Sequence, residues 1–524
     1  MSLDADRTPV IVAVGQTESR DLSSGPLELA AAAARAALGA APGLAAAIER
    51  LTVVNILAHG GSAPASHLAT ELGLRPLVAR ETTIIGGNTP QALVERAAGD
   101  IARGRLSATL ILGAEALGWR RRLPAENVPE QTAPALQAPA PLVADPVLGA
   151  HRQDLSDEEH MAGLLIPVHV YPLFESVLAA RAGRTPAEQR EFVGRVMAPF
   201  TEVAARHPHA WFPQARSAGE LATVTPENRL VVQPYVKTTV AFLGGAQAAA
   251  LVVTSLNVAR ALGLDEGALF VWSAASANDV WFPMARPDLG HSAGLEAAAG
   301  ATLSAAGVTV DEVSAFDVYS CFPSAVQIAA ASLGLPLDVD HPEQIRRLTL
   351  TGGLPYFGGP GNNYTTHAIA TMFENFRSGA GASRDDSRGR IGLVTSVGWY
   401  LTRHSVGIYG SREPAVGFSA EDSAKDTAKS QDAIDASALP CLTLGEAADA
   451  MATVVASTVY YDREGGPVGA PVIATLDDGR RVAASAGAEG LADVGDTWLV
   501  GARVHVEASA GGATGAHYRI LDLP

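Results

Sequence analysis

The sequence predicts an α/β protein built from two similar halves, with a segment inserted between them and a small β-domain after them. Short apolar runs alternate with helical patterns in the first part of the chain, which favours a parallel or mixed sheet covered by helices. The same order of elements returns further on, and the C-terminal part contains only short β-rich runs. These three observations define the fold class.

The first half begins with the apolar run Val10–Gly15, which is typical of a strand covered on both faces. A helical pattern follows at 26–41, and further strands are expected at 51–57, 81–87 and 108–117. The helix expected at 88–104 opens on Asn88 and Thr89 as possible caps, with Pro90 in its first turn.

The second half repeats this order. Its expected helices are 292–307, 322–334 and 363–376, and its expected strands are 312–320, 348–353 and 391–398. Gly86-Gly87, which ends "TTIIGG", corresponds to Gly352-Gly353, which ends "LTLTGG". Each pair precedes a polar helix start, an alanine-rich helix and a further strand. The chain therefore contains an internal duplication with a period too long for a solenoid.

The rest of the chain differs in composition. The segment between the halves is rich in proline and polar residues, the segment after the second half is charged and aperiodic, and the tail has β-rich runs split by the turns "REGG" and "DDGR". The predicted domains are a first half at 1–117 and 231–270, an insertion at 118–230, a second half at 271–411, a linker at 412–438 and an OB-like β-barrel at 439–524.

Composition excludes several classes of function. The net charge of −17 argues against nucleic acid as a partner, because phosphate binding needs a basic face. Two cysteines, Cys321 and Cys441, form no metal signature or disulfide framework, which fits a reducing cytoplasm. The charged N-terminus is no secretory signal. The apolar run 238–256 contains a glycine pair, a glutamine and threonines, so we expect a buried element there and no membrane span.

Several motifs in this order resemble the thiolase superfamily. "VIVAVGQT", "DEVSAFDVYSCFPSAVQIAAASLGL" and "TGGLPYFGGPG" are similar to segments of the sterol-carrier-protein type of thiolase, and the resemblance covers roughly Thr8 to Gly410. It implies a five-layered α-β-α-β-α fold. The extra β-domain resembles that of type-1 thiolase-like proteins.

Thiolases are acyltransferases that act on CoA thioesters with a cysteine nucleophile, a second acid/base cysteine, two histidines and two oxyanion holes. Carried over by motif, the nucleophile falls on Gly86 and the acid/base cysteine on Ser396. The two histidines fall on Tyr319 and Gly359. All four chemical groups are absent, so ordinary cysteine-dependent thiolysis is not expected.

Other groups near these loops remain candidates. The backbone N–H groups of Gly86 and Gly398 match the second oxyanion hole of the family. Polar side chains also gather there, and each has a structural alternative as a helix cap, a turn residue or a packed, hydrogen-bonded side chain. They are Asn88, Tyr319, Asn362, Asn363, Tyr364, His367 and His404.

Basic residues are candidates for binding CoA. Arg120 and Arg121 in "WRRR", and Lys237 in "QPYVKTT", can pair with phosphates, with Asn362 and Asn363 as further contacts. The alternative for the basic residues is a solvated face. Cys321 and Cys441 fall on no catalytic position of the family, so packing is the favoured role of the first and an inert role that of the second.

Two classes of function stay open. One is an enzyme with altered chemistry on acyl-CoA, such as retro-aldol C–C cleavage, because steroid side-chain aldolases of this fold also lack the cysteine, use tyrosines and need an OB-type partner. The other is a non-catalytic acyl-CoA or lipid-binding protein. We expect CoA or acyl-CoA as a ligand, with no permanently bound cofactor and no metal. The chain is expected to be a homodimer through the edge strand 81–87, or a monomer.

Overall fold

The centre of the protein is a ten-stranded sheet to which both halves of the chain contribute. The structure, a computed structural model, describes residues 3–74, 77–124, 144–379, 389–486, 491, 494, 496–508 and 515–522. The strand order is β10-β11-β12-β9-β1-β8-β4-β2-β3-β5. The strands are β1 (Pro9–Glu18), β2 (Arg50–Val53), β3 (Ala79–Thr83), β4 (Ala108–Glu115), β5 (Val147–Leu148), β8 (Gln247–Ser255), β9 (Leu269–Asn278), β10 (Ala315–Asp317), β11 (Ile391–Gly398) and β12 (Arg403–Gly410).

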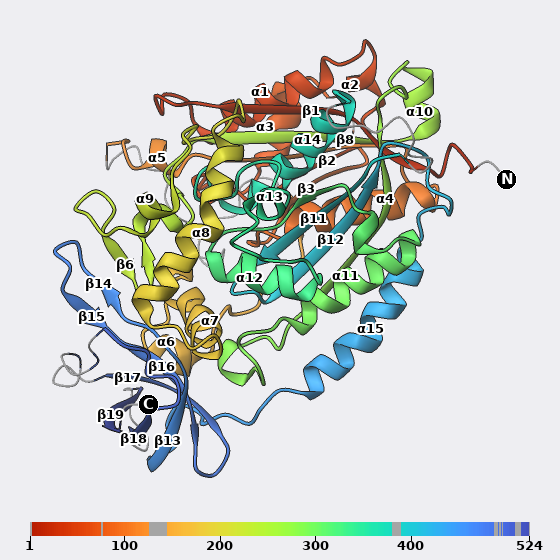
Figure 1. Cartoon of the computed structure of the whole chain (residues 1–524). Coiled ribbons are helices and arrows are strands. Elements are labelled where there is room, and N and C mark those ends of the chain that lie inside the picture. Colours follow the sequence, from red (N-terminus) through yellow and green to blue (C-terminus); the bar gives the residue numbers. More distant parts are fainter. Residues whose placement is uncertain are drawn as a thin grey trace.

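The helices complete five layers, as predicted (Figure 1). Two central helices, α4 (Thr89–Ala102) and α14 (Tyr364–Arg377), each contact strands of both halves. On the outside, α1 (Pro26–Leu38) packs on β1, β8 and β4, while α11 (Ala293–Ala306) packs on β9 and β12. The two halves meet where β1 pairs with β9. The remaining helices of the two halves are α2 (Leu44–Ala47), α3 (Pro64–Glu71), α10 (Leu256–Ala261), α12 (Pro323–Ser332) and α13 (Pro342–Arg346).

Small residues allow these layers to approach closely. At Gly15 on β1, an added Cβ would overlap the backbone carbonyl of Ala33 on α1. Strand β8 is buried along its whole length, as its apolar sequence predicts, so the run 238–256 supplies a core strand. No helix in the described part of the chain is long and apolar enough to cross a membrane.

The insertion lies at one end of the sheet (Figure 1). Its long helices are α7 (Pro167–Arg181) and α8 (Pro186–Ala204). The side chain of Thr185 caps α8 through a capping box with Glu188. The shorter elements are α5 (Leu117–Arg120), α6 (Asp157–Met161), α9 (Ala218–Ala222), β6 (Leu230–Val232) and β7 (Tyr235–Val236).

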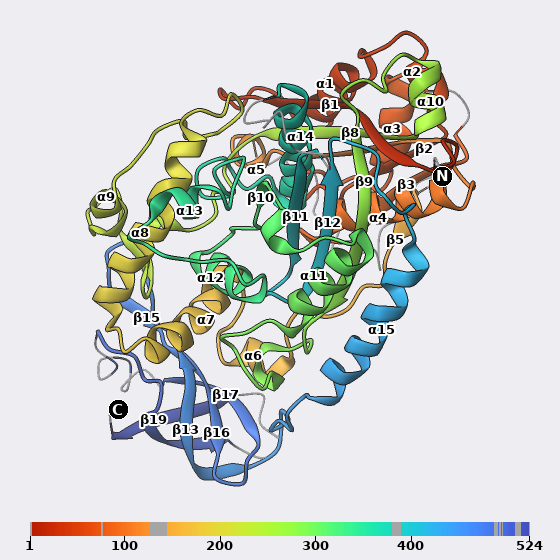
Figure 2. The ribbon, with the colours of Figure 1, turned by 45° about the vertical axis from the view of Figure 1, so that its right-hand side comes forward.

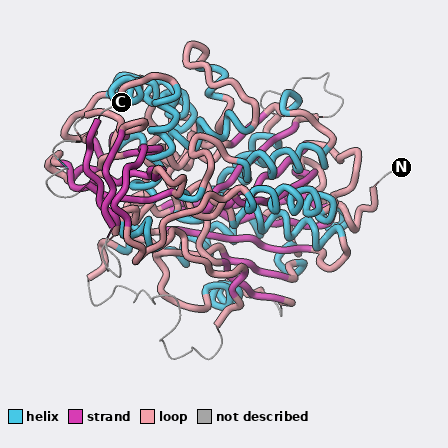
Figure 3. The backbone as a smooth tube through the Cα atoms, turned by 90° about the horizontal axis from the view of Figure 1, so that it is seen from below, coloured by secondary structure: helices cyan, strands magenta, loops and turns pink. Residues whose placement is uncertain are grey.

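The C-terminal domain is a closed five-stranded barrel, as predicted, with the order β13-β16-β17-β19-β18. Figure 3 shows its strands as a separate group beside the main sheet. It packs on the insertion: the Ser457 backbone N–H donates to Ser176 Oγ on α7 at 3.1 Å, and Tyr460 stacks on His169 at 4.2 Å. The strands of this part of the chain are β13 (Ala448–Ser457), β14 (Tyr460–Tyr461), β15 (Pro467–Gly469), β16 (Pro471–Leu476), β17 (Arg481–Ala486), β18 (Arg503–Ala508) and β19 (Ala516–Asp522).

The segment 348–353 is not a strand, so that prediction was wrong. The backbone N–H groups of this segment instead donate to the buried carboxylate of Asp317, at the end of β10. Asp317 Oδ2 accepts hydrogen bonds from the Leu350 and Thr351 N–H groups at 2.9 and 3.1 Å, and from the Thr351 hydroxyl at 3.0 Å. One side chain thus replaces a neighbouring strand, which the β-rich sequence could not reveal.

The segment expected as an aperiodic linker contains a helix, α15 (Ala420–Ala436), which packs on β9 and α11 (Figure 2). The side chain of Gln431 accepts from the N–H of Asn278 at 2.7 Å and donates to its carbonyl at 3.1 Å. Few apolar residues mark the packed face, although Ile434 is buried. The sequence therefore lacked the apolar stripe that identifies most surface helices.

The edge expected to pair two subunits is partly covered by the protein's own chain. Strand β5 pairs in parallel with the outer side of β3 at Thr82 and Thr83. Glu81 on β3 points inward: it is buried and bonded to Arg96 at 2.6 and 3.1 Å. Strand β5 covers part of this edge and so shortens its free length, and the charge of Glu81 plays no part in this.

Candidate functional site

The loop between β3 and α4 forms one side of the expected thiolase centre. Asn88 occupies the N-cap position of α4, but its side chain makes no capping hydrogen bond. Its Oδ1 atom is buried and has no hydrogen-bond partner in the described part of the protein. A Cβ added to Gly86 would lie 2.7 Å from this oxygen. The amide of Asn88 therefore occupies the space that a nucleophilic side chain at position 86 would need.

The end of β11 forms the opposite side. Ser396 Oγ donates to the backbone carbonyls of Ser405 and Asn88 at 3.1 and 3.4 Å, so this hydroxyl holds two segments together. A Cβ added to Gly398 would overlap Asn88 Oδ1. Gly86, Ser396 and Gly398 are thus brought to one place, as the resemblance implies, but the place is filled.

Tyr319 lies in the same centre. A Cβ added to Gly87 would overlap the Tyr319 hydroxyl, so this hydroxyl lies directly against the glycine. The ring packs edge-on against Tyr364 at 5.4 Å. No described residue forms a hydrogen bond with the hydroxyl, and burial raises the pKa of Tyr319 above its usual value. Tyr319 is therefore a neutral hydrogen-bond donor, with no partner here that lowers its pKa.

The loop before α14 closes the centre. Asn362 Oδ1 accepts a hydrogen bond from the Gly86 N–H at 2.9 Å, and Asn362 Nδ2 donates to the Asn55 carbonyl at 3.0 Å. The N–H expected in an oxyanion hole is thus already engaged. Asn363 and Tyr364 have internal roles: Asn363 Oδ1 accepts from Thr366 at 2.6 Å, and the Tyr364 hydroxyl donates to Asp317 at 2.9 Å.

Arg403 is a residue at this centre that the sequence did not single out. Its Nη1 atom would lie 3.4 Å from a Cβ on Gly86, and it donates a long hydrogen bond of 3.5 Å to the Ile85 carbonyl. It forms no ion pair with any described carboxylate, and burial lowers its pKa from the usual value. The register of the two strands brings it there, since Arg403 pairs with Gly398 across β11 and β12.

The two candidate histidines lie elsewhere, in structural networks. His367 Nδ1 bonds Gln16 Oε1 at 2.8 Å, and burial holds the pKa of His367 well below its usual value. His404 Nε2 lies 2.9 Å from Asp279 Oδ2 and 3.1 Å from Ser292 Oγ. Both rings are fully buried, which favours the structural interpretation.

Gly359, the position that the resemblance gives to the second histidine, is bonded to the segment 240–242. Its N–H donates to the Phe242 carbonyl at 2.8 Å. The adjoining N–H of Ala241 donates to the Cys321 carbonyl at 3.0 Å, and that of Phe242 to the Leu354 carbonyl at 3.3 Å. The segment 240–242 is therefore bonded to the loop after Tyr319 and to the loop that contains Gly359.

A pocket with a volume of about 760 Å³ is lined by residues of this segment. Apolar walls come from Val240, Phe242 and Pro355, with Phe212 at its edge, 37% exposed. Lys237, predicted as a CoA contact, lines it, and so do residues that the sequence did not single out: Arg216, Tyr356, Asn228 and three threonines. Glu220 and Glu227 line it too, so the pocket offers an apolar slot with two cations and two carboxylates.

The other predicted CoA contacts do not line this pocket. Arg120 Nη1 donates to the Leu57 carbonyl at 3.0 Å and lies near the buried Glu115. Arg121 is exposed at the end of α5. Asn362 and Asn363 face the filled centre and the sheet. The structure therefore brings only Lys237 of these residues to the pocket.

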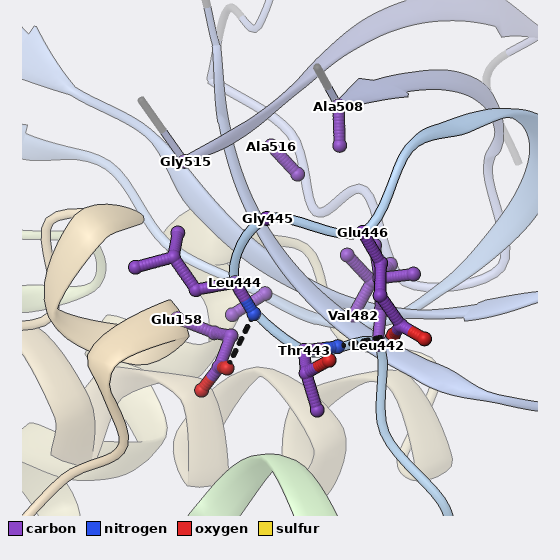
Figure 4. Close-up of a pocket in the computed structure, with 11 residues that line it drawn as sticks. Glu158, Leu442, Thr443, Leu444, Gly445, Glu446, Val482, Ala508, Gly515 and Ala516 are labelled. Atoms are coloured by element: carbon purple, nitrogen blue, oxygen red, sulfur yellow. Dashed lines mark hydrogen bonds between the residues drawn. The ribbon is translucent and has the colours of Figure 1, made fainter. Parts of the chain in front are cut away.

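A smaller cavity lies between the barrel and α6 (Figure 4). The Leu444 N–H donates to Glu158 Oε1 at 2.7 Å, and the Thr443 N–H donates to Glu446 Oε2 at 2.8 Å. The volume of this cavity, about 20 Å³, leaves room for little more than a water molecule.

Neither cysteine creates a second centre: burial raises the pKa of Cys321 to about 12 and that of Cys441 to about 11. Within the described residues, no group of three metal-ligating side chains could hold an ion.

Comparisons with known proteins agree with this geometry. No family model and no curated protein matches the chain. Among solved structures, it is similar to a monomeric SCP2-thiolase-like protein of type 1 from Mycobacterium smegmatis, with 30% identity, coverage of 99% of this chain and 100% of that chain, and a TM-score of 0.80. It is also similar to an Ltp2-ChsH2(DUF35) aldolase at 21% identity, with coverage of 78% and 98% and a TM-score of 0.56.

The same fold occurs in the dimeric peroxisomal thiolase of Saccharomyces cerevisiae, at 16% identity, with coverage of 78% of this chain and 99% of that chain and a TM-score of 0.55. The fold defines a thiolase-like protein. More narrowly, the chain belongs to the SCP2-thiolase-like proteins of type 1.

Proposed function

We propose that this protein binds acyl-CoA thioesters, or lipid ligands of similar shape, in the 760 Å³ pocket and does not perform cysteine-dependent acyl transfer. A volume of this size lies within the usual range for small-molecule sites of roughly 300–1,000 Å³. The position of the segment 240–242 carries the proposal. It forms one wall of the pocket and is bonded on its other side to the loops around Tyr319 and Gly359.

The chemistry of the walls supports an amphiphilic ligand. Phe242 and Phe212 pack edge-on at 4.8 Å and offer an apolar surface for an acyl chain. The hydroxyls of three threonines can accept from the amides of a pantetheine arm, and Lys237 is exposed where phosphates could remain in water. At the position that the resemblance gives to the nucleophile, Gly86 has no side chain, and Asn88 Oδ1 fills the space beside it.

Isothermal titration with CoA and dodecanoyl-CoA tests the proposal. We expect saturable binding of dodecanoyl-CoA, abolished in Val240→Trp, where the indole fills the pocket, and retained in Val416→Trp, which changes an exposed valine outside the pocket. Thiolysis of acetoacetyl-CoA should stay at the buffer rate. Equal binding by wild type and Val240→Trp would place the ligand elsewhere.

A second candidate is retro-aldol cleavage of a 3-hydroxyacyl-CoA. The fused barrel favours it, because one similar structure is an aldolase named together with a DUF35 partner. The barrel is fixed on the insertion, with Trp498 Nε1 donating to the Arg184 carbonyl at 3.0 Å. Mass spectrometry of a 3-hydroxyacyl-CoA incubated with the protein would detect a shorter acyl-CoA and a carbonyl product. If the substrate is unchanged, binding is the only one of the two functions that remains.

A further inference from the structure

The segment 207–212 of the insertion forms one edge of the 760 Å³ pocket through the ring of Phe212. Its backbone is bonded to the loop before α14. The Trp211 N–H donates to the Phe357 carbonyl at 2.8 Å, and the next N–H, that of Phe212, donates to the Tyr356 carbonyl at 2.9 Å. Tyr356 lines the same pocket. The shape of this edge therefore depends on whether the segment stays on the main body.

His207 holds the start of this segment. Its ring is buried, and its Nδ1 atom accepts the backbone N–H of His209 at 3.2 Å. Its Nε2 atom lies 3.0 Å from Thr371 Oγ1 on α14, and the ring packs edge-on against Phe357 at 4.9 Å. A ring nitrogen that accepts a hydrogen bond carries no proton, so the imidazole is neutral, with its proton on Nε2. A second proton, on Nδ1, would place two donors face to face.

The charged groups around His207 supply no direct counter-ion. The Glu18 carboxylate is bonded to His209 Nδ1 at 2.7 Å and lies 3.7 Å from the Arg20 guanidinium. No described carboxylate forms an ion pair with His207 itself. Burial and the neighbouring imidazole of His209 lower the pKa of His207 to about 4. The titratable and charged groups that face this cluster are His209 on the same segment, Glu18 and Arg20 at the end of β1, and His367 and Glu374 on α14.

We propose that protonation of His207 releases the segment 207–212 from the main body and so loosens this edge of the pocket. The proton enters on Nδ1, where it replaces the hydrogen bond from the His209 N–H, so one of the bonds that hold the segment is lost. Once the segment opens, the ring reaches water and its pKa returns to about 6.5. Acid thus favours the open segment. The inference goes beyond the proposed function, because it concerns the empty pocket as well.

Hydrogen exchange of the Trp211 and Phe212 amides, measured by mass spectrometry at about pH 7.5 and pH 5, tests this acid-dependent opening. After correction for the intrinsic exchange rate, we expect the opening constant of wild type to rise by at least about tenfold towards the lower pH. His207→Gln keeps an acceptor and a donor but does not titrate, so its opening constant should change by less than about threefold. His341→Gln, at an exposed histidine outside the pocket, should behave as wild type.

The full pH profile of wild type gives a second measurement that needs no variant. The opening constant should begin to rise below about pH 6.5, the value of a free imidazole, and not near the pKa of a free carboxyl. Addition of dodecanoyl-CoA separates this inference from the proposed function, because a ligand in the pocket should slow the exchange of both amides. Acid-dependent opening without any effect of the ligand would support the role of His207 and count against acyl-CoA binding. An opening constant that is independent of pH in wild type, or that rises equally in His207→Gln, would overturn that role.

Discussion

The side-chain carbonyl of Asn362 accepts a hydrogen bond from the backbone N–H of Gly86 at 2.9 Å, across 276 residues of sequence. In the thiolase arrangement this N–H would face a developing oxyanion, where preorganised donors give their largest effect. Here an amide of the protein itself occupies that position, and Asn88 Oδ1 fills the space beside it. Loss of the nucleophile is therefore accompanied by closure of the site around it.

Restoring the nucleophile alone should not restore acyl transfer. In Gly86→Cys the new Cβ would lie 2.7 Å from Asn88 Oδ1, so the thiol must displace an amide in a packed site. No side-chain base lies beside it, because Ser396 Oγ is bonded to backbone carbonyls. We expect no thiolysis of acetoacetyl-CoA, and alkylation by iodoacetamide at least about tenfold slower than for free cysteine. Burst release of an acyl product would contradict this reasoning.

The fold could be predicted because its signals are local and repeated. Long apolar runs such as Gln247–Ser255, and paired glycines before each central helix, occur at matching places in the two halves. The absence of the family's catalytic groups stays a prediction from the motifs, because each motif contains its catalytic residue in a short stretch. The wrongly predicted strand at 348–353 and the helix that was not predicted within the linker involve segments held by distant side chains, Asp317 and Gln431.

The pocket could not be predicted in the same way. Arg216 and Tyr356 are far apart in sequence and meet only because the insertion packs on the loop after Gly353. Arg403 reaches Gly86 through the register of β11 and β12, which one sequence does not specify. Most isolated basic residues of a protein bind no ligand. The run that contains Arg120 and Arg121 therefore stands out in the sequence, whereas the single Arg216 does not.

Asp317→Ala should strongly destabilise the protein. The buried carboxylate accepts from two N–H groups and two hydroxyls of residues 349–351 and from the Tyr364 hydroxyl. Removing it leaves several buried donors without a partner, each costing roughly 1–3 kcal/mol. We expect a loss of about 3 kcal/mol or more in the free energy of unfolding, measured by urea denaturation. Asp477→Ala, which removes only an exposed ion pair with Arg503 on a turn of the barrel, is the control and should leave stability close to that of wild type.

Tyr319→Phe separates packing from chemistry at the filled centre. No described residue bonds the hydroxyl, so its removal should leave the melting temperature within about 2 °C of wild type. If the hydroxyl donates to a thioester carbonyl, dodecanoyl-CoA affinity falls about fivefold, as expected for one hydrogen bond. Unchanged affinity and unchanged turnover of any acyl-CoA would reduce Tyr319 to a packing residue.

The protein should be monomeric. Strand β5 covers part of the outer edge of β3, with the Ile84 N–H donating to the Leu148 carbonyl at 3.0 Å. Backbone donors used in this way cannot pair with a second subunit. Light scattering at micromolar concentration should give a particle of 54.0 kDa. A particle of twice that mass, also found in Leu148→Pro, would show that two chains associate through a surface other than this edge.

His207 should make stability depend on pH. Its Nδ1 accepts the His209 N–H at 3.2 Å and its Nε2 bonds Thr371 Oγ1 at 3.0 Å, so the folded protein holds the ring neutral. Burial, with a further contribution from His209, lowers the pKa of His207 to about 4, below its usual value near 6.5. The unfolded chain thus binds more protons between these two values, and stability contributed by His207 is lost as pH falls from about 6.5 to 4.

Other buried groups act in the opposite direction, so the comparison must be made between variants. Burial raises the pKa of Glu115 and of Glu159 to about 7, and each contributes stability that is lost as pH rises through that value. In His207→Gln these carboxyls are unchanged, and only the imidazole is removed. We expect wild type to lose roughly 3 kcal/mol more than His207→Gln between pH 6.5 and 4, from the size of the pKa shift. Urea denaturation at several pH values measures this difference, and parallel curves would show that His207 does not titrate in this range.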